Sequence, residues 1–453
     1  MTVGALAGPL GGQLAGGDAT FTALSTDTRT LAPGELFVAL SGPRHDGNAF
    51  VGQAAVHGAV AALVSRPVDV AMPCLVVPDT RLALGRLGAL WRQAARARVV
   101  AVTGSNGKTT VKEMIAAILR RRGRVLATLG NLNNDIGVPL TLARLQDEDY
   151  AVVEMGANHL GEIGYLSGLA QPDVALLNNA GIAHLEGFGS PEAIARGKAE
   201  ILTGLAADGV FVYPADSPWV PLWRELAAGR RCACFGLAAD ADITSSGAAV
   251  LRWDAAGFHQ RFALRAGGAT VEIELPLAGM HNRLNALAAT AAALALGATL
   301  DDARAGLATL RPVPGRLAPR RRADGGWLVD DTYNANPDSV AAAIAVLAAA
   351  SGRRILALGD LAELGAGAAA LHAALGERAR AAGIDALYTV GALSAAASAA
   401  FGEGARHFAS RQAMAVALRA TLGPGDLVLV KGSRSARMEG IVASLVAEEG
   451  VPC

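Results

Sequence analysis

A short run of glycine, lysine and threonine residues follows an apolar stretch near residue 100. Residues 101–110 read Ala-Val-Thr-Gly-Ser-Asn-Gly-Lys-Thr-Thr. Gly104 and Gly107 allow backbone N–H groups to approach phosphate oxygens closely, and Lys108 can neutralise those oxygens. Thr109 can place its hydroxyl on Mg²⁺. The chemistry that these residue types and this spacing predict is the binding of ATP with Mg²⁺.

The segments on either side are those that a phosphate loop needs. Small branched residues precede Gly104, as in a buried strand, and a helix is expected over 111–120. The helix would point the positive end of its dipole at the bound anion. The general phosphate-loop pattern has glycine where Val102 stands, so this loop is a shortened form. A chance Gly-Lys-Thr in an ordinary turn is the alternative. We expect the nucleotide to contact Gly104, Ser105, Asn106, Gly107, Lys108, Thr109 and Thr110.

Three polar residues further along the chain stand where a nucleotide–Mg²⁺ site would need them. Glu154 ends a predicted strand, at the sheet edge where open α/β sheets bind ligands, and is a candidate Mg²⁺ ligand. His184 follows the strand expected at 174–178. Lys198 lies on a helix that Ser190 can cap. The alternatives are an ordinary acidic residue at a strand end, a structural histidine and a solvated lysine.

Length and composition limit the class of protein. The chain has 453 residues, about three times a typical domain. Its 40 Lys and Arg residues balance 40 Asp and Glu residues, so we expect neither nucleic acid nor an anionic membrane as partner. Every apolar run is shorter than the ~18 to 20 residues of a membrane span, and no secretory signal is recognisable. We therefore expect a cytoplasmic protein without stable membrane insertion.

Short branched runs alternate with longer runs rich in alanine and leucine. This alternation is typical of α/β layers with mainly parallel sheets. Three blocks can be separated, the last two by the Pro- and Gly-containing linker 311–315. Strands are expected at 35–40 and 59–65 in the first block, at 124–128, 151–154 and 174–178 in the second, and at 326–330, 353–358, 386–390 and 426–430 in the third, with a helix at 82–97 before the phosphate loop.

These motifs together resemble the Mur ligase family, ATP-dependent amide-forming enzymes that extend the peptide stem of bacterial cell-wall precursors. The phosphate loop, Glu154, His184, Lys198 and the segment Gly279-Met-His-Asn-Arg-Leu-Asn follow in the family's order, over nearly the whole chain. The resemblance implies a small UDP-substrate domain at 1–82, a central phosphate-loop ATPase domain with a mainly parallel sheet at 83–312, and a Rossmann-like domain at 313–453.

Five segments resemble the branch of the family that joins D-alanyl-D-alanine to UDP-N-acetylmuramoyl-tripeptide: 130–139, 154–163, 331–337, 359–365 and 431–434. That reaction, through an acyl phosphate, is the expected function, and these two molecules are the expected substrates. The alternatives are a family member that adds a single amino acid and a folylpolyglutamate synthase-like ligase. We expect a monomer, although no motif fixes the oligomeric state.

The resemblance also implies a role for each site residue. Lys108, His184 and Lys198 are the expected catalytic residues. Thr109 and Glu154 would hold a first Mg²⁺, and His184 and Lys198 would serve a second. Because an ammonium group cannot bind a cation, Lys198 is expected to carry CO₂ as a carbamate.

The remaining expected contacts also come from the resemblance. Asn282 is expected to read adenine, with a helix N-cap as its alternative role. Further nucleotide contacts are expected from Arg316, Asp331, Asn334 and Asn336. The substrates are expected to contact Ser25, Asp27, Arg29 and Asp46 in the first domain, Asn131, Asn133 and Asn134 in the second, and Asp360, Lys431 and Arg434 in the third. The run 320–322, three arginines, is expected to be solvated surface.

Overall fold

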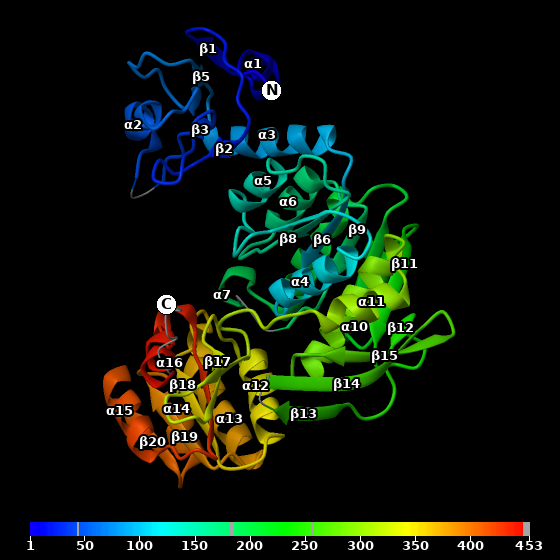
Figure 1. The fold of residues 1–453 in the computed structure, drawn as a ribbon, viewed down its shortest axis with the longest axis vertical. Helices are drawn as coiled ribbons and strands as arrows, with labels where there is room; N and C mark the ends of the chain where they lie inside the picture. The colour runs from blue at the N-terminus through cyan, green and yellow to red at the C-terminus, as the bar shows by residue number, and fades with distance from the viewer. Residues whose placement is uncertain (43–44, 182–184, 255–256, 447–453) are drawn as a thin grey trace.

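Three β-sheets follow one another along the chain. The computed structural model describes residues 1–42, 45–181, 185–254 and 257–446. Figure 1 shows the sheets in order from the blue N-terminal end to the red C-terminal end, each with its own helices. The three-domain α/β fold predicted from the sequence is therefore confirmed. Within the described residues, no helix is both long and apolar enough to cross a membrane.

The N-terminal domain is built on a five-stranded sheet of order β1-β5-β4-β3-β2, parallel except for β1. Its elements are α1 (Ala7–Leu10), β1 (Gln13–Ala15), β2 (Leu24–Ser25), β3 (Leu36–Val38), α2 (Val51–Val56), β4 (Ala61–Val64) and β5 (Cys74–Val76). The helix α3 (Thr80–Ala94) leads out of this domain. The Asp79 carboxylate caps α3 by accepting from the backbone N–H groups of Arg81 and Leu82. Leu84 and Leu87 of α3 pack into the N-terminal core.

The central domain has a ten-stranded sheet of order β13-β14-β12-β11-β10-β9-β6-β8-β7, in which β15 pairs with β14. The seven strands from β12 to β7 in this order are parallel. Its strands are β6 (Arg98–Thr103), β7 (Val125–Ala127), β8 (Tyr150–Glu154), β9 (Val174–Leu177), β10 (Val210–Pro214), β11 (Arg231–Gly236), β12 (Ile243–Thr244), β13 (Val250–Asp254), β14 (Gly257–Ala266) and β15 (Ala269–Leu275). Its helices are α4 (Lys108–Leu119), α5 (Gly137–Leu142), α6 (Glu162–Ala170), α7 (Leu185–Phe188), α8 (Pro191–Ala199), α9 (Val220–Leu226), α10 (Met280–Ala295) and α11 (Leu300–Ala308). The antiparallel extension β13-β14-β15 was not predicted.

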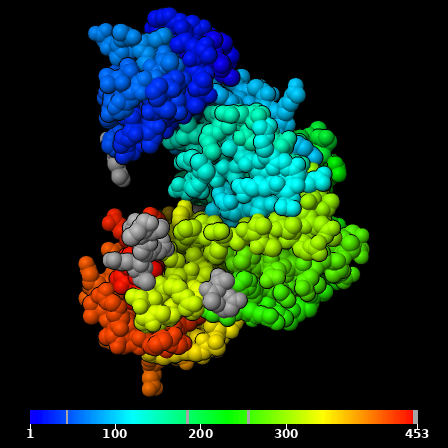
Figure 2. Space-filling view, in the orientation of Figure 1, coloured from blue at the N-terminus to red at the C-terminus, as the bar shows by residue number. Residues whose placement is uncertain are grey.

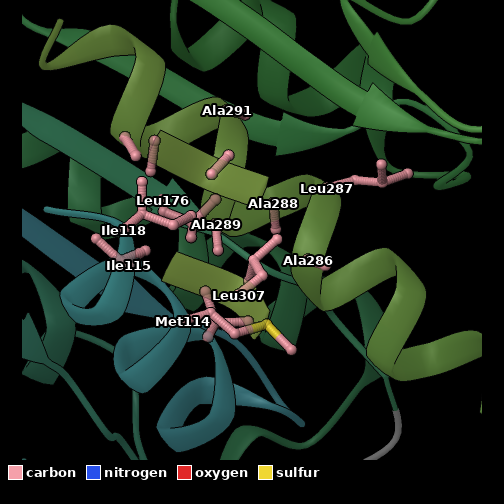
Figure 3. Packing of buried hydrophobic residues seen from close by; sticks show 14 of the residues in the cluster. Met114, Ile115, Ile118, Leu176, Ala286, Leu287, Ala288, Ala289, Ala291 and Leu307 are labelled. Carbon is pink, nitrogen blue, oxygen red and sulfur yellow. The ribbon is translucent and has the colours of Figure 1, made fainter. Parts of the chain in front are cut away.

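Helices α4 and α10 pack side by side on one face of the central sheet. Figure 3 shows Met114, Ile115 and Ile118 of α4 beside the alanine-rich stretch 286–291 of α10. Small side chains on α10 let the two helices approach closely, and the residues in this cluster are buried. The packing fixes the start of α4 and the start of α10 relative to each other, and both starts carry candidate site residues.

The C-terminal domain has a six-stranded sheet of order β16-β17-β21-β18-β19-β20, parallel except for β16. Its strands are β16 (Ala318–Arg321), β17 (Trp327–Asp331), β18 (Arg354–Gly359), β19 (Ala386–Val390), β20 (Ala405–Phe408) and β21 (Leu427–Lys431). Its helices are α12 (Pro337–Ala348), α13 (Ala368–Ala381), α14 (Ala395–Phe401), α15 (Arg411–Thr421) and α16 (Glu439–Leu445).

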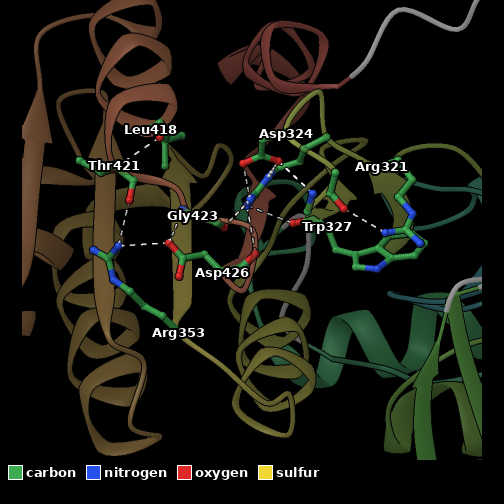
Figure 4. A network of polar contacts seen from close by, with 11 residues as sticks. Arg321, Asp324, Trp327, Arg353, Leu418, Thr421, Gly423 and Asp426 are labelled. Atoms are coloured by element: carbon green, nitrogen blue, oxygen red, sulfur yellow. Dashed lines mark hydrogen bonds and ion pairs between the residues drawn. The ribbon is translucent and has the colours of Figure 1, made fainter.

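One expectation for this domain is wrong. Arg322, placed on the solvated surface by the sequence analysis, is buried. Its guanidinium pairs with Asp324 at 2.7 Å and donates to the carbonyl oxygens of Gly423 and Asp426 (Figure 4). A guanidinium has enough donors to join the turn at Asp324 to the 423–426 segment. Arg322 is therefore a structural residue of the C-terminal domain.

Candidate active site

A cavity of about 1180 Å³ lies between the central and C-terminal domains and reaches the start of α3. Figure 2 shows the molecule hollowed on this side, between the blue N-terminal and the red C-terminal domain. One wall comes from the phosphate loop and the starts of α6 and α10, and the facing wall from 315–317, 331–339, 362–364 and 431–435. Residues far apart in the sequence thus share one space.

The phosphate loop joins β6 to α4 and forms part of the central wall. Gly104 and Gly107 have φ angles of 150° and 77°, which a residue with a Cβ rarely adopts. A Cβ on Gly107 would also lie 2.7 Å from the Asn285 side-chain oxygen. No side chain caps the start of α4, so its first N–H groups are available to an anion. The loop is therefore shaped as predicted for phosphate.

Lys108 begins α4 and points back along the loop. Its Nζ donates to the carbonyl oxygen of Gly104 at 2.7 Å. Enclosure by protein lowers the pKa of the Lys108 ammonium, and the negative charge of Glu154 opposes this effect. Glu154 is the negative charge that favours the charged form of Lys108. A bound phosphate would add a second negative charge beside this ammonium.

A hydroxyl and a carboxylate meet beside the loop. Thr109 Oγ1 donates to Glu154 Oε2 at 2.9 Å, and Asn133 Nδ2 donates to Glu154 Oε1 at 2.8 Å. Glu154 is buried, and its backbone N–H donates to the Thr128 hydroxyl at 2.9 Å. Mg²⁺ in nucleotide sites takes one or two protein oxygens and completes its shell with water and phosphate. The hydroxyl oxygen of Thr109 and the carboxylate oxygens of Glu154 fit that requirement. In the described part of the chain, no three His, Cys, Asp or Glu side chains lie close enough together to hold a metal ion by themselves.

Lys198 is buried, with 1% of its surface exposed, so the solvated-lysine alternative is wrong. Ser190 caps α8 through a bond from the Ala193 N–H, as predicted. The Lys198 Nζ donates to the Ala157 carbonyl at 3.4 Å, and Ala157 lines the cavity. Burial, helped by the positive charge of Lys108, lowers the pKa of Lys198 to about 7. His184, its expected neighbour in the second metal site, lies outside the described residues.

Asn282 lies in the first turn of α10 and lines the cavity. The N-cap of α10 is Gly279, with no side-chain cap, so the capping alternative for Asn282 is wrong. The Asn282 amide donates to the Ala278 carbonyl at 2.8 Å and accepts from Asn285 at 3.1 Å. His281 also lines the cavity, and enclosure lowers its pKa to about 4, so it is neutral at pH 7.

The C-terminal wall contains the other expected nucleotide residues. Asp331 and Lys431 form an ion pair of 2.7 Å, and Lys431 also donates to the Asn334 carbonyl at 2.9 Å. The Arg316 guanidinium lies over the Tyr333 ring, 4.2 Å from its centroid. All of these residues line the cavity.

Asn336 connects the two walls. Its side-chain oxygen caps α12 by accepting from the Ser339 N–H at 2.9 Å. Its amide nitrogen donates to the side-chain oxygen of Asn106 in the phosphate loop at 2.8 Å. The C-terminal domain is thereby hydrogen-bonded to the loop expected to hold ATP.

Several expected substrate residues do not line this cavity: Ser25, Asp27, Arg29, Asp46, Asn131 and Asp360. The Asp360 carboxylate instead accepts from the Ser394 backbone at 2.8 Å. Asp27 and Arg29 form an exposed pair of 2.6 Å on the N-terminal domain, and the Arg29 guanidinium lowers the pKa of Asp27 to about 2.

Three further asparagines hold the phosphate loop in place, and two of them, Asn179 and Asn285, line the cavity. Asn178 and Asn179 donate to the Asn106 carbonyl, and Asn285 accepts from Asn178. Asn178 and Asn179 directly follow β9, so their place at the carboxyl edge of the sheet was a usable signal. Arg81, which pairs with Asp135 on the other side of the cavity, carried no such signal.

Three family models match the chain. They are described as the Mur ligase family catalytic domain at 20–121, the Mur ligase middle domain at 102–293, and the Mur ligase glutamate ligase domain at 315–434. The chain belongs to the Mur ligase family. The resemblance stated from the sequence is therefore confirmed.

Named relatives in the Mur ligase family cover almost the full chain. UDP-N-acetylmuramoyl-tripeptide–D-alanyl-D-alanine ligase from Escherichia coli is 49% identical over 98% of each chain. The crystal structure of MurF from Acinetobacter baumannii is 37% identical over 97% of each chain, with a TM-score of 0.90. MurF ligase from Thermotoga maritima, solved in complex with ADP, is 29% identical over 93% of this chain and 96% of its own, with a TM-score of 0.83.

Proposed function

We propose that this Mur ligase joins D-alanyl-D-alanine to UDP-N-acetylmuramoyl-tripeptide with ATP, in the synthesis of peptidoglycan precursors. The similarity to the Escherichia coli ligase along almost the entire chain is the observation that supports this choice of substrates. The phosphate loop and the Thr109–Glu154 pair in one cavity support the use of ATP.

The chemistry follows from the poor leaving group of a carboxylate. The γ-phosphoryl group of ATP moves onto the terminal carboxylate of the tripeptide and gives an acyl phosphate and ADP. The neutral amine of D-alanyl-D-alanine attacks the acyl carbon, and phosphate leaves from the tetrahedral intermediate. Lys108 holds the transferred phosphoryl group and offsets the repulsion between two anions.

Mg²⁺ is the metal that the donor set suits. Thr109 and Glu154 would hold it, and it would neutralise charge between the β- and γ-phosphates. Asn133 then orients the Glu154 carboxylate from the other side. Asn282, Arg316, Asp331, Asn334 and Asn336 are the residues that we assign to the nucleotide.

Lys198 is proposed to carry a carbamate. CO₂ reacts with the neutral amine, and a pKa of about 7 keeps much of this amine neutral at physiological pH. The carbamate would turn a buried cation into an anionic oxygen ligand beside the positive Lys108. A second Mg²⁺, served by this carbamate and His184, is part of the same proposal.

The other substrate contacts are assigned by domain. We assign the UDP part to the N-terminal domain, 1–82, with Asp27 orienting Arg29. The muramoyl peptide is assigned to Asn133 and Asn134 of the central domain, 83–312, and the dipeptide to Lys431 and Arg434 of the C-terminal domain, 313–453. A monomer acting in the cytoplasm, where ATP is supplied, completes the proposal.

The test is phosphate release from ATP in the presence of UDP-N-acetylmuramoyl-tripeptide. D-alanyl-D-alanine should stimulate release and single amino acids should not. The Lys108→Ala variant is the control for release that does not depend on the phosphate loop. If only a single diamino acid stimulated phosphate release, the chain would instead be a Mur ligase that adds one amino acid.

A further inference from the structure

His372 is a fully buried histidine in the C-terminal domain, on α13. Its Nδ1 lies 2.7 Å from the Ala368 carbonyl oxygen, and the Leu361 backbone N–H donates to its Nε2 at 3.0 Å. A carbonyl only accepts and an N–H only donates, so Nδ1 carries the proton and Nε2 is the acceptor. Both ring nitrogens are therefore used, and one of them holds a backbone group 11 residues earlier in the chain.

The segment that His372 holds turns sharply at the edge of the cavity. Leu361 and Leu364 are buried in the C-terminal core. Between them, Glu363 has a φ angle of 61°, in the left-handed region that non-glycine residues avoid. Such a conformation persists only where the surrounding structure holds it, and it is frequent at functional sites. Ala362, Glu363 and Leu364 line the cavity, whereas Asp360 does not.

A second loop is fastened to the same segment. The Ser433 backbone N–H and hydroxyl donate to the Asp360 carbonyl oxygen at 3.0 and 2.7 Å. Ser433, Arg434 and Ser435 line the cavity beside 362–364. The two loops follow the neighbouring strands β18 and β21, so together they form one wall with an acidic side chain, Glu363, and a basic side chain, Arg434.

We propose that His372 is a positioning residue for the wall 362–364, and that this wall receives the incoming dipeptide. By accepting from Leu361, His372 holds the start of the turn that brings Glu363 to the cavity. A dipeptide with a free amine and a free carboxylate is matched by a wall with one acidic and one basic side chain. The inference rests on the proposed ligase function, and it concerns binding of the amine substrate rather than of ATP.

The experiment measures the Michaelis constants for D-alanyl-D-alanine and for ATP in four single variants and one double variant, His372→Leu with Glu363→Gly. His372→Leu removes the acceptor, and His372→Gln offers an amide oxygen in its place. Glu363→Gly adopts a positive φ without strain and removes the carboxylate. His407→Leu is the control, because His407 is an exposed histidine of the same domain that hydrogen-bonds to Thr389 and lies outside the cavity lining.

His372→Leu should raise KM for D-alanyl-D-alanine about tenfold, as expected for a lost buried hydrogen bond, and leave KM for ATP unchanged. His372→Gln should restore most of the loss, and His407→Leu should change neither constant. When Glu363→Gly is already present, adding His372→Leu should raise KM for D-alanyl-D-alanine little further, because both changes act on the same turn.

Three results would overturn the proposal. They are an unchanged dipeptide KM in folded His372→Leu protein, an equal rise for dipeptide and ATP, and a full additional effect in the Glu363→Gly background. If His372→Leu does not fold, His372→Gln is compared with the unmodified protein instead. A dipeptide KM that rises as much in His372→Gln as in Glu363→Gly would also overturn the proposal. An unmodified chain that forms no product with D-alanyl-D-alanine would contradict the ligase function itself, which separates that failure from this one.

Discussion

Lys198 in the central domain and Lys431 in the C-terminal domain are buried to the same degree, at 1% and 2% exposure, but their surroundings differ. Lys431 has a carboxylate oxygen of Asp331 at 2.7 Å and a carbonyl oxygen at 2.9 Å. Lys198 has a carbonyl oxygen at 3.4 Å and the Phe188 ring at 5.1 Å. Glu162 and Glu200 favour its charged form, but burial has the larger effect.

The difference separates two uses of a buried lysine. A close carboxylate compensates the charge of Lys431, so that side chain joins 331–334 to β21 as a fixed ion pair. Lys198 lacks a close carboxylate among the described residues, so its amine can become neutral and nucleophilic near pH 7. Burial alone therefore does not identify a reactive lysine, whereas burial without a counter-ion does.

The largest expected effect comes from removing the Lys198 amine. Lys198→Ala should lower turnover on the order of 10²–10³-fold, because a charged group near the transferred phosphoryl is lost. Added acetate or formate should restore part of the activity by replacing the oxygens of the proposed carbamate. Lys198→Arg is the control, since guanidinium cannot form this carbamate. Turnover of Lys198→Ala equal to that of the unmodified enzyme would contradict the proposed role.

Breaking the Asp331–Lys431 pair should act mainly on stability. Asp331→Ala leaves a buried ammonium without its partner and should lower the free energy of unfolding by about 3–5 kcal/mol. Adding Lys431→Met should recover most of that loss. The measurement is denaturant unfolding of the nucleotide-free single and double variants. Additive losses in the double variant would show that the two side chains do not act as a pair.

Lys198 should also make the stability of the chain depend on pH. The pKa of Lys198 is lowered to about 7 in the folded chain, so between pH 7 and about 10 the unfolded chain binds more protons. Stability should therefore rise with pH across this window, with a slope from this group of at most about 1.4 kcal/mol per unit. Lys198→Met should flatten the slope, and Lys431→Met provides the comparison. The same slope in Lys198→Met as in the unmodified chain would argue against a depressed pKa.

Lys112 is a third buried lysine, intermediate between Lys198 and Lys431, and its replacement should have the smallest effect. It is buried, donates to the Thr128 carbonyl at 2.7 Å and pairs with the half-buried Glu113 at 2.7 Å. Lys112→Met should cost about 1–2 kcal/mol of unfolding free energy, because one buried carbonyl loses its donor. Turnover should change little. A loss of turnover as large as that of Lys198→Ala would place Lys112 in the chemistry as well.

Local patterns allowed much of the site to be predicted. Gly104 to Thr110 could be assigned because strand, loop and helix are contiguous in the chain, and Ser190 with Pro191 fixed the helix that carries Lys198. The burial of Lys198 could not be predicted, since it depends on Phe188 and Ala157 packing over it.

Features that depend on the tertiary structure could not be predicted from local patterns. Asp360 and Glu363 stand three residues apart, with Glu363 in the left-handed region, yet Glu363 lines the cavity and Asp360 does not. The burial of Arg322 depends on Gly423 and Asp426, about a hundred residues away. The extension β13-β14-β15 continues the central sheet, and the local sequence pattern does not determine the order of strands in a sheet.

Transfer of the γ-phosphoryl group from ATP to a substrate carboxylate is the central claim, and oxygen labelling tests it directly. The terminal carboxylate of UDP-N-acetylmuramoyl-tripeptide is labelled with ¹⁸O, and the phosphate released during reaction with ATP and D-alanyl-D-alanine is analysed by mass spectrometry. An acyl phosphate requires one labelled oxygen to leave with the phosphate. Phosphate without ¹⁸O, formed together with the amide product, would contradict carboxylate activation in this cavity.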